Sequence, residues 1–143
     1  MKKLIILSSL VAIITFSACA QGLDASKLPV AVKTAFAKKF PGTTAEWGKE
    51  NSKEYEAEFK INGKSVSANF LTDGSWVETE MEINNDELPQ PVADAVKTKY
   101  PEAALLKVYK IVNAIGETTY EAEIKTGLKK KELVLKADGT FIK

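Results

Sequence analysis

The fold is decided by residues 55–70, Tyr55-Glu56-Ala57-Glu58-Phe59-Lys60-Ile61-Asn62-Gly63-Lys64-Ser65-Val66-Ser67-Ala68-Asn69-Phe70. Apolar and polar residues alternate on both sides of Asn62-Gly63, and this alternation indicates strands with one buried face. Asn-Gly is a preferred pair for two-residue hairpin turns. Folding there pairs Phe59 with Val66 and Tyr55 with Phe70, so both strands present the same apolar face. The stretch therefore predicts an antiparallel hairpin.

Asp73-Gly74 predicts a second turn that extends the hairpin into a sheet. As a two-residue turn it pairs Phe70 with Val77, and it keeps one apolar face across three strands. Trp76 then falls on the opposite, polar face. A further strand is expected near residues 44–49.

A helix is predicted ahead of these strands. Its apolar residues recur at helical spacing and form a single stripe, made of Leu28, Val32, Ala35, Phe36 and Phe40. Pro41 ends the helix, because the residue before a proline is biased away from helical geometry. A helix with one apolar stripe packs against the apolar face of a sheet.

The same order of motifs occurs twice along the chain, which indicates an internal duplication. The matching segments are Leu28-Pro29 with Leu88-Pro89, Phe40-Pro41 with Tyr100-Pro101, Tyr55-Glu56-Ala57-Glu58 with Tyr120-Glu121-Ala122-Glu123, and Asp73-Gly74 with Asp138-Gly139. Gly127-Leu128 supplies the hairpin turn of the second copy and is predicted to pair Ala122 with Leu133 and Tyr120 with Leu135. The predicted fold is α+β, with two tandem helix-plus-antiparallel-sheet units over residues 21–83 and 84–143. Helices cover one face of the sheet, and the other face is open.

Residues 1–20 are predicted to be a signal peptide. Lys2 and Lys3 precede an apolar run from Leu4 to Phe16, which is too short for a transmembrane helix. The small residues of Ala18-Cys19-Ala20 allow cleavage after Ala20. Alternatively, Cys19 is lipidated and becomes the mature N-terminus. Both alternatives place the protein in the periplasm or cell envelope, and only lipidation attaches it to a membrane.

The composition excludes several classes of function. The basic residues are all Lys and the net charge is +1, which argues against nucleic-acid binding. The chain has no His and one Cys, so we expect no transition-metal site and no catalysis by His or Cys. No cofactor-binding motif occurs, and we assign no catalytic, metal-binding or cofactor-binding residue.

A candidate binding surface lies on the predicted open face. Leu71, Trp76 and Phe141 are expected to be exposed apolar residues there, where protein contacts often form. A group of acidic residues surrounds them and is expected to attract a basic partner; it consists of Glu56, Glu58, Glu78 and Glu80. The alternating glutamates are otherwise the solvated face of a sheet.

The Leu-Pro, Tyr/Phe-Pro, Tyr-Glu-Ala-Glu and Asp-Gly motifs together resemble the PepSY-like family of exported bacterial proteins, also described as β-lactamase-inhibitor-like. The resemblance covers residues 24–143 and implies an envelope location and a protein-binding or inhibitory role. We therefore expect a non-enzymatic module that binds an unidentified envelope protein or peptide through its open face. The alternatives are a structural envelope protein without a discrete ligand, and an enzyme that acts through surface carboxylates.

Overall fold

One antiparallel sheet carries both halves of the chain in the computed structural model, which describes residues 22–142. The predicted signal peptide and Cys19 lie outside the described residues. The sheet has seven strands in the order of the sequence. They are β1 (Glu46–Lys49), β2 (Glu54–Ile61), β3 (Lys64–Leu71), β4 (Trp76–Ile83), β5 (Ala104–Asn113), β6 (Thr118–Thr126) and β7 (Lys129–Lys136).

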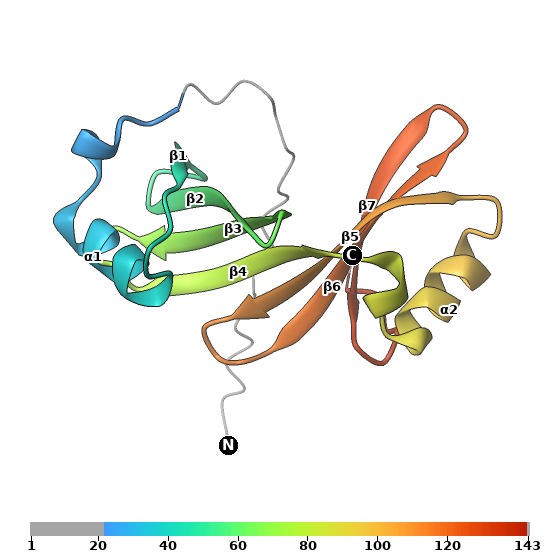
Figure 1. Ribbon diagram of the computed structural model, residues 1–143. Coiled ribbons are helices and arrows are strands. Elements are labelled where there is room, and N and C mark those ends of the chain that lie inside the picture. Colours follow the sequence, from blue (N-terminus) through green and yellow to red (C-terminus); the bar gives the residue numbers. More distant parts are fainter. Residues whose placement is uncertain (1–21, 143) are drawn as a thin grey trace, which may run out of the picture.

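Each half has one α-helix, preceded by a 3₁₀ turn. The helices are α1 (Val30–Lys39) and α2 (Gln90–Lys99), and the turns are η1 (Ala25–Lys27) and η2 (Asn85–Glu87). The two helices lie at opposite ends of the sheet, with β4 running between the halves (Figure 1). Within residues 22–142, no helix is long and apolar enough to cross a membrane. The predicted α+β class is confirmed.

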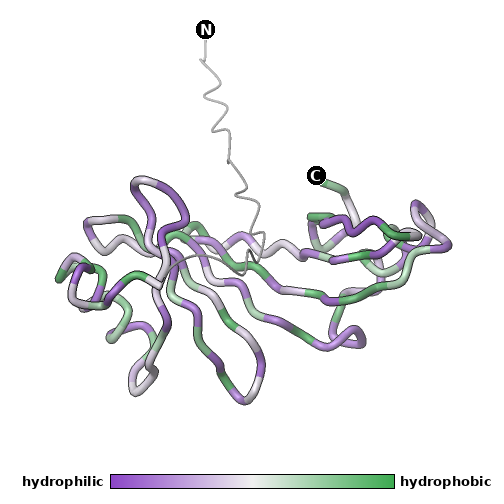
Figure 2. The backbone as a smooth tube through the Cα atoms, turned by 90° about the horizontal axis from the view of Figure 1, so that it is seen from above, coloured by the Kyte–Doolittle hydropathy of each residue, from purple (hydrophilic) through white to green (hydrophobic). Residues whose placement is uncertain are grey.

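Both helices cover the same face of the sheet. On β4, Met81 packs with the core under α1, and Ile83 packs with the core under α2. Residues two apart on a strand point to the same side, so the two cores share one face. The strands change colour repeatedly along their length in Figure 2, as this alternation requires.

The two cores differ in the size of their side chains. In the first, the Phe36 ring lies 5.1 Å from that of Trp47 and 5.3 Å from that of Phe59. In the second, Val96 replaces Phe36 at the repeat offset, and Val108 pairs with Ala122 as Trp47 pairs with Ala57. A partly open, mainly apolar cavity of about 280 Å³ lies beside α2, and Val96 is one of the residues that line it.

The predicted registers of the two hairpins are confirmed. Phe59 pairs with Val66 and Tyr55 with Phe70 across the Asn62-Gly63 turn. Gly127-Leu128 likewise pairs Ala122 with Leu133 and Tyr120 with Leu135. The unit boundaries, residues 21–83 and 84–143, stay a prediction, since β4 and β5 pair in one uninterrupted sheet.

The predicted pairing of Phe70 with Val77 across the Asp73-Gly74 turn was wrong by one residue. The loop has three residues, because the Leu71 amide donates to the Ser75 carbonyl. Phe70 therefore pairs with Trp76, and a bulge at Val77 restores the predicted pairing further along the strand. Asp138-Gly139 repeats this loop: the Lys136 amide donates to Thr140, and Leu135 pairs with Phe141.

Candidate functional site: the open face of the sheet

The sheet face opposite the helices, which we call the open face, is rich in carboxylates. The register sets side chains of neighbouring strands next to one another there. Two adjacent rows run from β1 to β5: Gly48, Glu56, Asn69, Glu78 and Asn113 in one, and Glu46, Glu58, Ser67, Glu80 and Ile111 in the other. Alternation thus places all four predicted acidic residues on one face.

Five polar side chains are buried among the described residues of this face, and they are Glu56, Ser67, Asn69, Glu80 and Glu121. Glu56 is 9% exposed, Asn69 is 2% exposed and Glu80 is 4% exposed. One oxygen of each has no hydrogen-bond partner among the described residues: Glu56 Oε1, Asn69 Oδ1 and Glu80 Oε2. A buried acceptor without a donor lowers the stability of the fold, so its presence calls for a structural or functional explanation. We call these three residues the acceptor cluster.

Burial and mutual repulsion disfavour ionisation in the acceptor cluster. Burial, and then the charge of Glu121 and its acidic neighbours, raises the pKa of Glu80 from 4.5 to about 9. Burial, and then the charge of Glu58, raises the pKa of Glu56 to about 7. Burial also raises the pKa of Glu78. The central carboxyl groups thus hold protons at a pH where exposed glutamates are ionised.

Acidic residues at the margin of the open face are paired with lysines. Lys107 Nζ lies 3.6 Å from Glu82 Oε2, and Lys130 Nζ lies 2.7 Å from Glu123 Oε1. Within residues 22–142, the ion pairs of the structure include neither Glu56 nor Glu80. The lysines therefore pair with carboxylates at the margin, and the carboxyl groups of Glu56 and Glu80 at the centre have no lysine in an ion pair with them.

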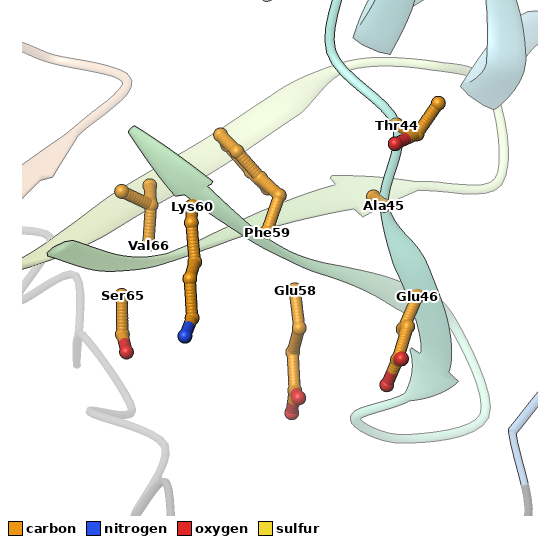
Figure 3. A pocket seen from close by; sticks show the side chains of 8 residues that line it. All are labelled: Thr44, Ala45, Glu46, Glu58, Phe59, Lys60, Ser65 and Val66. Carbon is orange, nitrogen blue, oxygen red and sulfur yellow. The ribbon is translucent and has the colours of Figure 1, made fainter. Parts of the chain in front are cut away.

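A groove of about 460 Å³ lies at the β1 edge of the sheet, where residues of both faces line it (Figure 3). The side chains of Glu46, Glu58 and Lys60 point to one side of the sheet there, and Phe59 points to the other. The groove is lined by Thr44, Ala45, Glu46, Glu58, Phe59, Lys60, Ser65 and Val66. It forms where β1 begins, since Glu46 is paired with Glu58 and the described β1–β2 pairing stops there.

The predicted position of Trp76 on the open face was wrong. Trp76 packs against the core under α1, its Nε1 donates to Thr79 Oγ1 at 3.0 Å, and Lys39 covers its ring. The three-residue loop causes the change, because it moves Trp76 by one position and so to the helix side.

Phe141 is corrected in the same way, since it packs against the core under α2. Leu71 is half-buried, and the alternation of β3 leaves it on the open face, two residues from Asn69. The structure therefore keeps the acidic residues of the predicted surface together and separates two of its three apolar residues from them. Asn69 was missed, because a single Asn in a strand carries no signal of burial.

The chemistry of the open face is that of hydrogen-bond acceptors. Its central groups are carboxyl oxygens and one amide oxygen, which suit a cation that donates several hydrogen bonds. Within residues 22–142, no group of three or more His, Cys, Asp or Glu side chains is arranged to hold a metal ion. The arrangement is suited to binding a basic group.

Comparison with known proteins identifies the family. A family model described as "Putative beta-lactamase-inhibitor-like, PepSY-like" matches residues 17–67 and 53–143. The chain belongs to the PepSY-like family. This family is described by likeness to an inhibitor and not by a catalytic activity. No match is found among curated proteins.

Solved structures from Bacteroides species share the fold of this PepSY-like protein. A protein of Bacteroides eggerthii described as a putative periplasmic protein has a TM-score of 0.75 at 19% identity, over 81% of this chain and 86% of its own. A DUF2874 family protein of Bacteroides uniformis has a TM-score of 0.73 at 21% identity, over 80% and 86%. A BLIP-like protein of Bacteroides fragilis has a TM-score of 0.64 at 24% identity, over 79% and 82%. At these identities the likeness concerns the fold.

Proposed function

We propose that this PepSY-like protein is a periplasmic, non-catalytic binding module that takes a basic segment of an envelope protein or peptide on its open face. The observation that carries the proposal is the burial of Glu56 and Glu80 without a cationic partner among the described residues. A buried carboxylate is unfavourable alone and is stabilised by a cation. A basic ligand supplies that cation.

Two observations support the periplasm as the site of action. The fold is shared with a Bacteroides eggerthii protein described as a putative periplasmic protein. In addition, residues 1–20 have the charge and apolar run expected of a signal peptide. Binding on the open face covers the bound segment. The protein therefore acts as an inhibitor wherever another protein must bind that same segment.

The proposal is tested with three peptides of equal length that carry a basic, a neutral or an acidic net charge. Protein purified after expression of the full chain is titrated with each peptide, and backbone amide shifts are recorded by NMR. We expect only the basic peptide to bind, with weaker binding at high salt and with shifts at Ser67, Asn69 and Ile111.

The control is Glu102→Gln, which removes an equal charge at an exposed position after α2, away from the open face. It should leave binding unchanged, whereas Glu56→Gln should weaken it. Absence of binding by the basic peptide at low salt would refute the proposed function. Shifts confined to α1 and α2 would move the binding surface to the helices.

A further inference from the structure

The acceptor cluster has a specific geometry within the open face. Its three residues come from adjacent strands: Glu56 on β2 pairs directly with Asn69 on β3, and Glu80 lies one row further along on β4. Directly paired residues in an antiparallel sheet have Cβ atoms about 4.5–5.5 Å apart, and diagonal neighbours are somewhat further apart. The three residues therefore occupy neighbouring positions on three adjacent strands of one face.

The three oxygens without partners are best satisfied by a ligand group that carries several N–H donors. A guanidinium has five N–H donors in a planar fork and is weakly hydrated, so it suits buried acceptors on different strands. A lysine ammonium is more compact and more strongly hydrated, which makes its transfer to a buried site less favourable. Asn69 adds a neutral acceptor beside the two carboxyl groups, so the three acceptors lie on three strands. The wider fork of a guanidinium matches this spread better than an ammonium, whose three donors diverge from one nitrogen.

The occupant must come from another molecule. All basic residues of this chain are lysines, so the chain cannot supply a guanidinium itself. Two lysines of the open face are already in ion pairs at its margin, Lys107 with Glu82 and Lys130 with Glu123. The cluster lies on the open face, where the neighbouring Glu58 is exposed and Glu78 is half-buried. Its unpartnered oxygens are covered by neighbouring side chains, which must move aside when the guanidinium binds.

We propose that the acceptor cluster of Glu56, Asn69 and Glu80 receives an arginine side chain of the polypeptide segment bound on the open face. This inference rests on the proposed function and specifies its ligand. The flanking groove along β2 holds the chain on one side of that arginine, next to Glu46 and Glu58.

The binding of arginine is coupled to the loss of protons. Glu80 faces acidic groups from β2, β4, β6 and β7, and Tyr109 from β5 is also close; the acidic groups are Glu56, Glu78, Glu121 and Glu132. Repulsion among them favours protonated carboxyl groups in the free protein. A guanidinium favours the ionised form of Glu80, so that binding releases protons.

The test uses three peptides with the same sequence except at one central position, which is Arg, Lys or citrulline. Citrulline keeps the shape of arginine without its charge. We expect the Arg peptide to bind roughly tenfold more tightly than the Lys peptide, and the citrulline peptide to bind weakest. Calorimetry in buffers of different ionisation enthalpy should show proton release with the Arg peptide.

Variants of the protein locate the site. Glu80→Gln should reduce the affinity for the Arg peptide roughly tenfold and remove most of the preference for Arg over Lys. Glu102→Gln, at an exposed position after α2 that borders neither the acceptor cluster nor the groove, should change the affinity by no more than about twofold. Glu58→Gln tests the groove separately. Thermal unfolding of each variant confirms that it is folded.

The outcomes separate this inference from the proposed function. Equal binding of the Arg and Lys peptides, with no effect of Glu80→Gln, would overturn the arginine site and leave the basic-segment proposal standing. If no basic peptide binds, the proposed function fails and the arginine site fails with it. A loss of binding on Glu58→Gln alone would place the site in the groove instead of the acceptor cluster.

Discussion

The ammonium nitrogen of Lys39 lies 3.4 Å from the centre of the Trp76 ring, which joins the end of α1 to the start of β4. Lys99 and Phe141 repeat this relationship in the second half at 4.1 Å. Each ring therefore has core residues on one side and a cation towards solvent. The two rings stabilise the contact between helix and sheet.

Trp76→Ala should destabilise the fold. The substitution removes a large side chain from the edge of the first core together with its hydrogen bond to Thr79, so we expect a loss of about 2–3 kcal/mol in the free energy of unfolding. Urea denaturation measures the loss. Trp76→Phe retains a ring and should cost less. An unchanged urea midpoint for Trp76→Ala would show that the ring contributes little to the core.

Gly74→Ala should be costly for two reasons. Gly74 has a φ of +87°, and a Cβ atom there would lie 2.7 Å from the carbonyl oxygen of Ala31 in α1. Backbone strain and this clash should together cost more than about 2 kcal/mol. Gly63→Ala is the matched control, since Gly63 has a φ of +81° with no atom within 4 Å of the added Cβ. Equal urea midpoints for the two variants would contradict a contact between the loop and α1.

Glu80→Gln should stabilise the protein at neutral pH. The folded state raises the pKa of Glu80 from 4.5 to about 9, so it binds a proton that the unfolded chain releases. Stability therefore falls as the pH rises from 4.5 towards 9. At pH 7 the difference corresponds to about 3 kcal/mol, which Gln avoids because it stays neutral.

Urea midpoints at about pH 5, 7 and 9 test this relationship. The variant should gain stability over the wild type as the pH rises, with little gain at about pH 5. Glu102→Gln is the control and should follow the wild type. A constant difference between wild type and Glu80→Gln at all three values would rule out a raised pKa at Glu80.

Val96→Phe should be tolerated or stabilising. Val96 lines the cavity of about 280 Å³ beside α2, and its counterpart in the first half is Phe36. Filling an apolar cavity recovers buried contacts, so we expect a gain of about 1 kcal/mol by urea denaturation. The reverse change, Phe36→Val, should cost about 2–3 kcal/mol. A loss of stability with Val96→Phe would show that the second core cannot accept the larger ring.

The sequence predicted the parts of the fold that local patterns determine. Asn62-Gly63 and Gly127-Leu128 set their hairpin registers, because alternation on both strands allows one solution. Asp73-Gly74 did not, since Asp-Gly suits both a two-residue turn and a three-residue loop with a bulge. In the three-residue loop, Gly74 lies close to Ala31 of α1. That contact depends on tertiary packing, which local sequence does not show.

The candidate site was predicted in part for a similar reason. Alternation placed Glu56 and Glu80 on the open face, where the structure has them. Their burial could not be predicted, because it depends on how side chains from distant strands crowd together. Tyr109 and Glu121 come from the second half of the chain, and both are buried on this face. No local pattern near Glu80 indicates such neighbours.

The pairing of β4 with β5 determines what happens when one half of the chain is expressed without the other. Residues 78–83 of β4 pair along their length with residues 108–113 of β5, and this ladder connects the two helix-covered halves. A fragment that ends after Ile83 would leave the outer backbone groups of β4 unpaired, as in an edge strand that invites self-association. The first half expressed alone should therefore dimerise or aggregate through β4. Each half therefore depends on the other for a hydrogen-bonded partner along this strand.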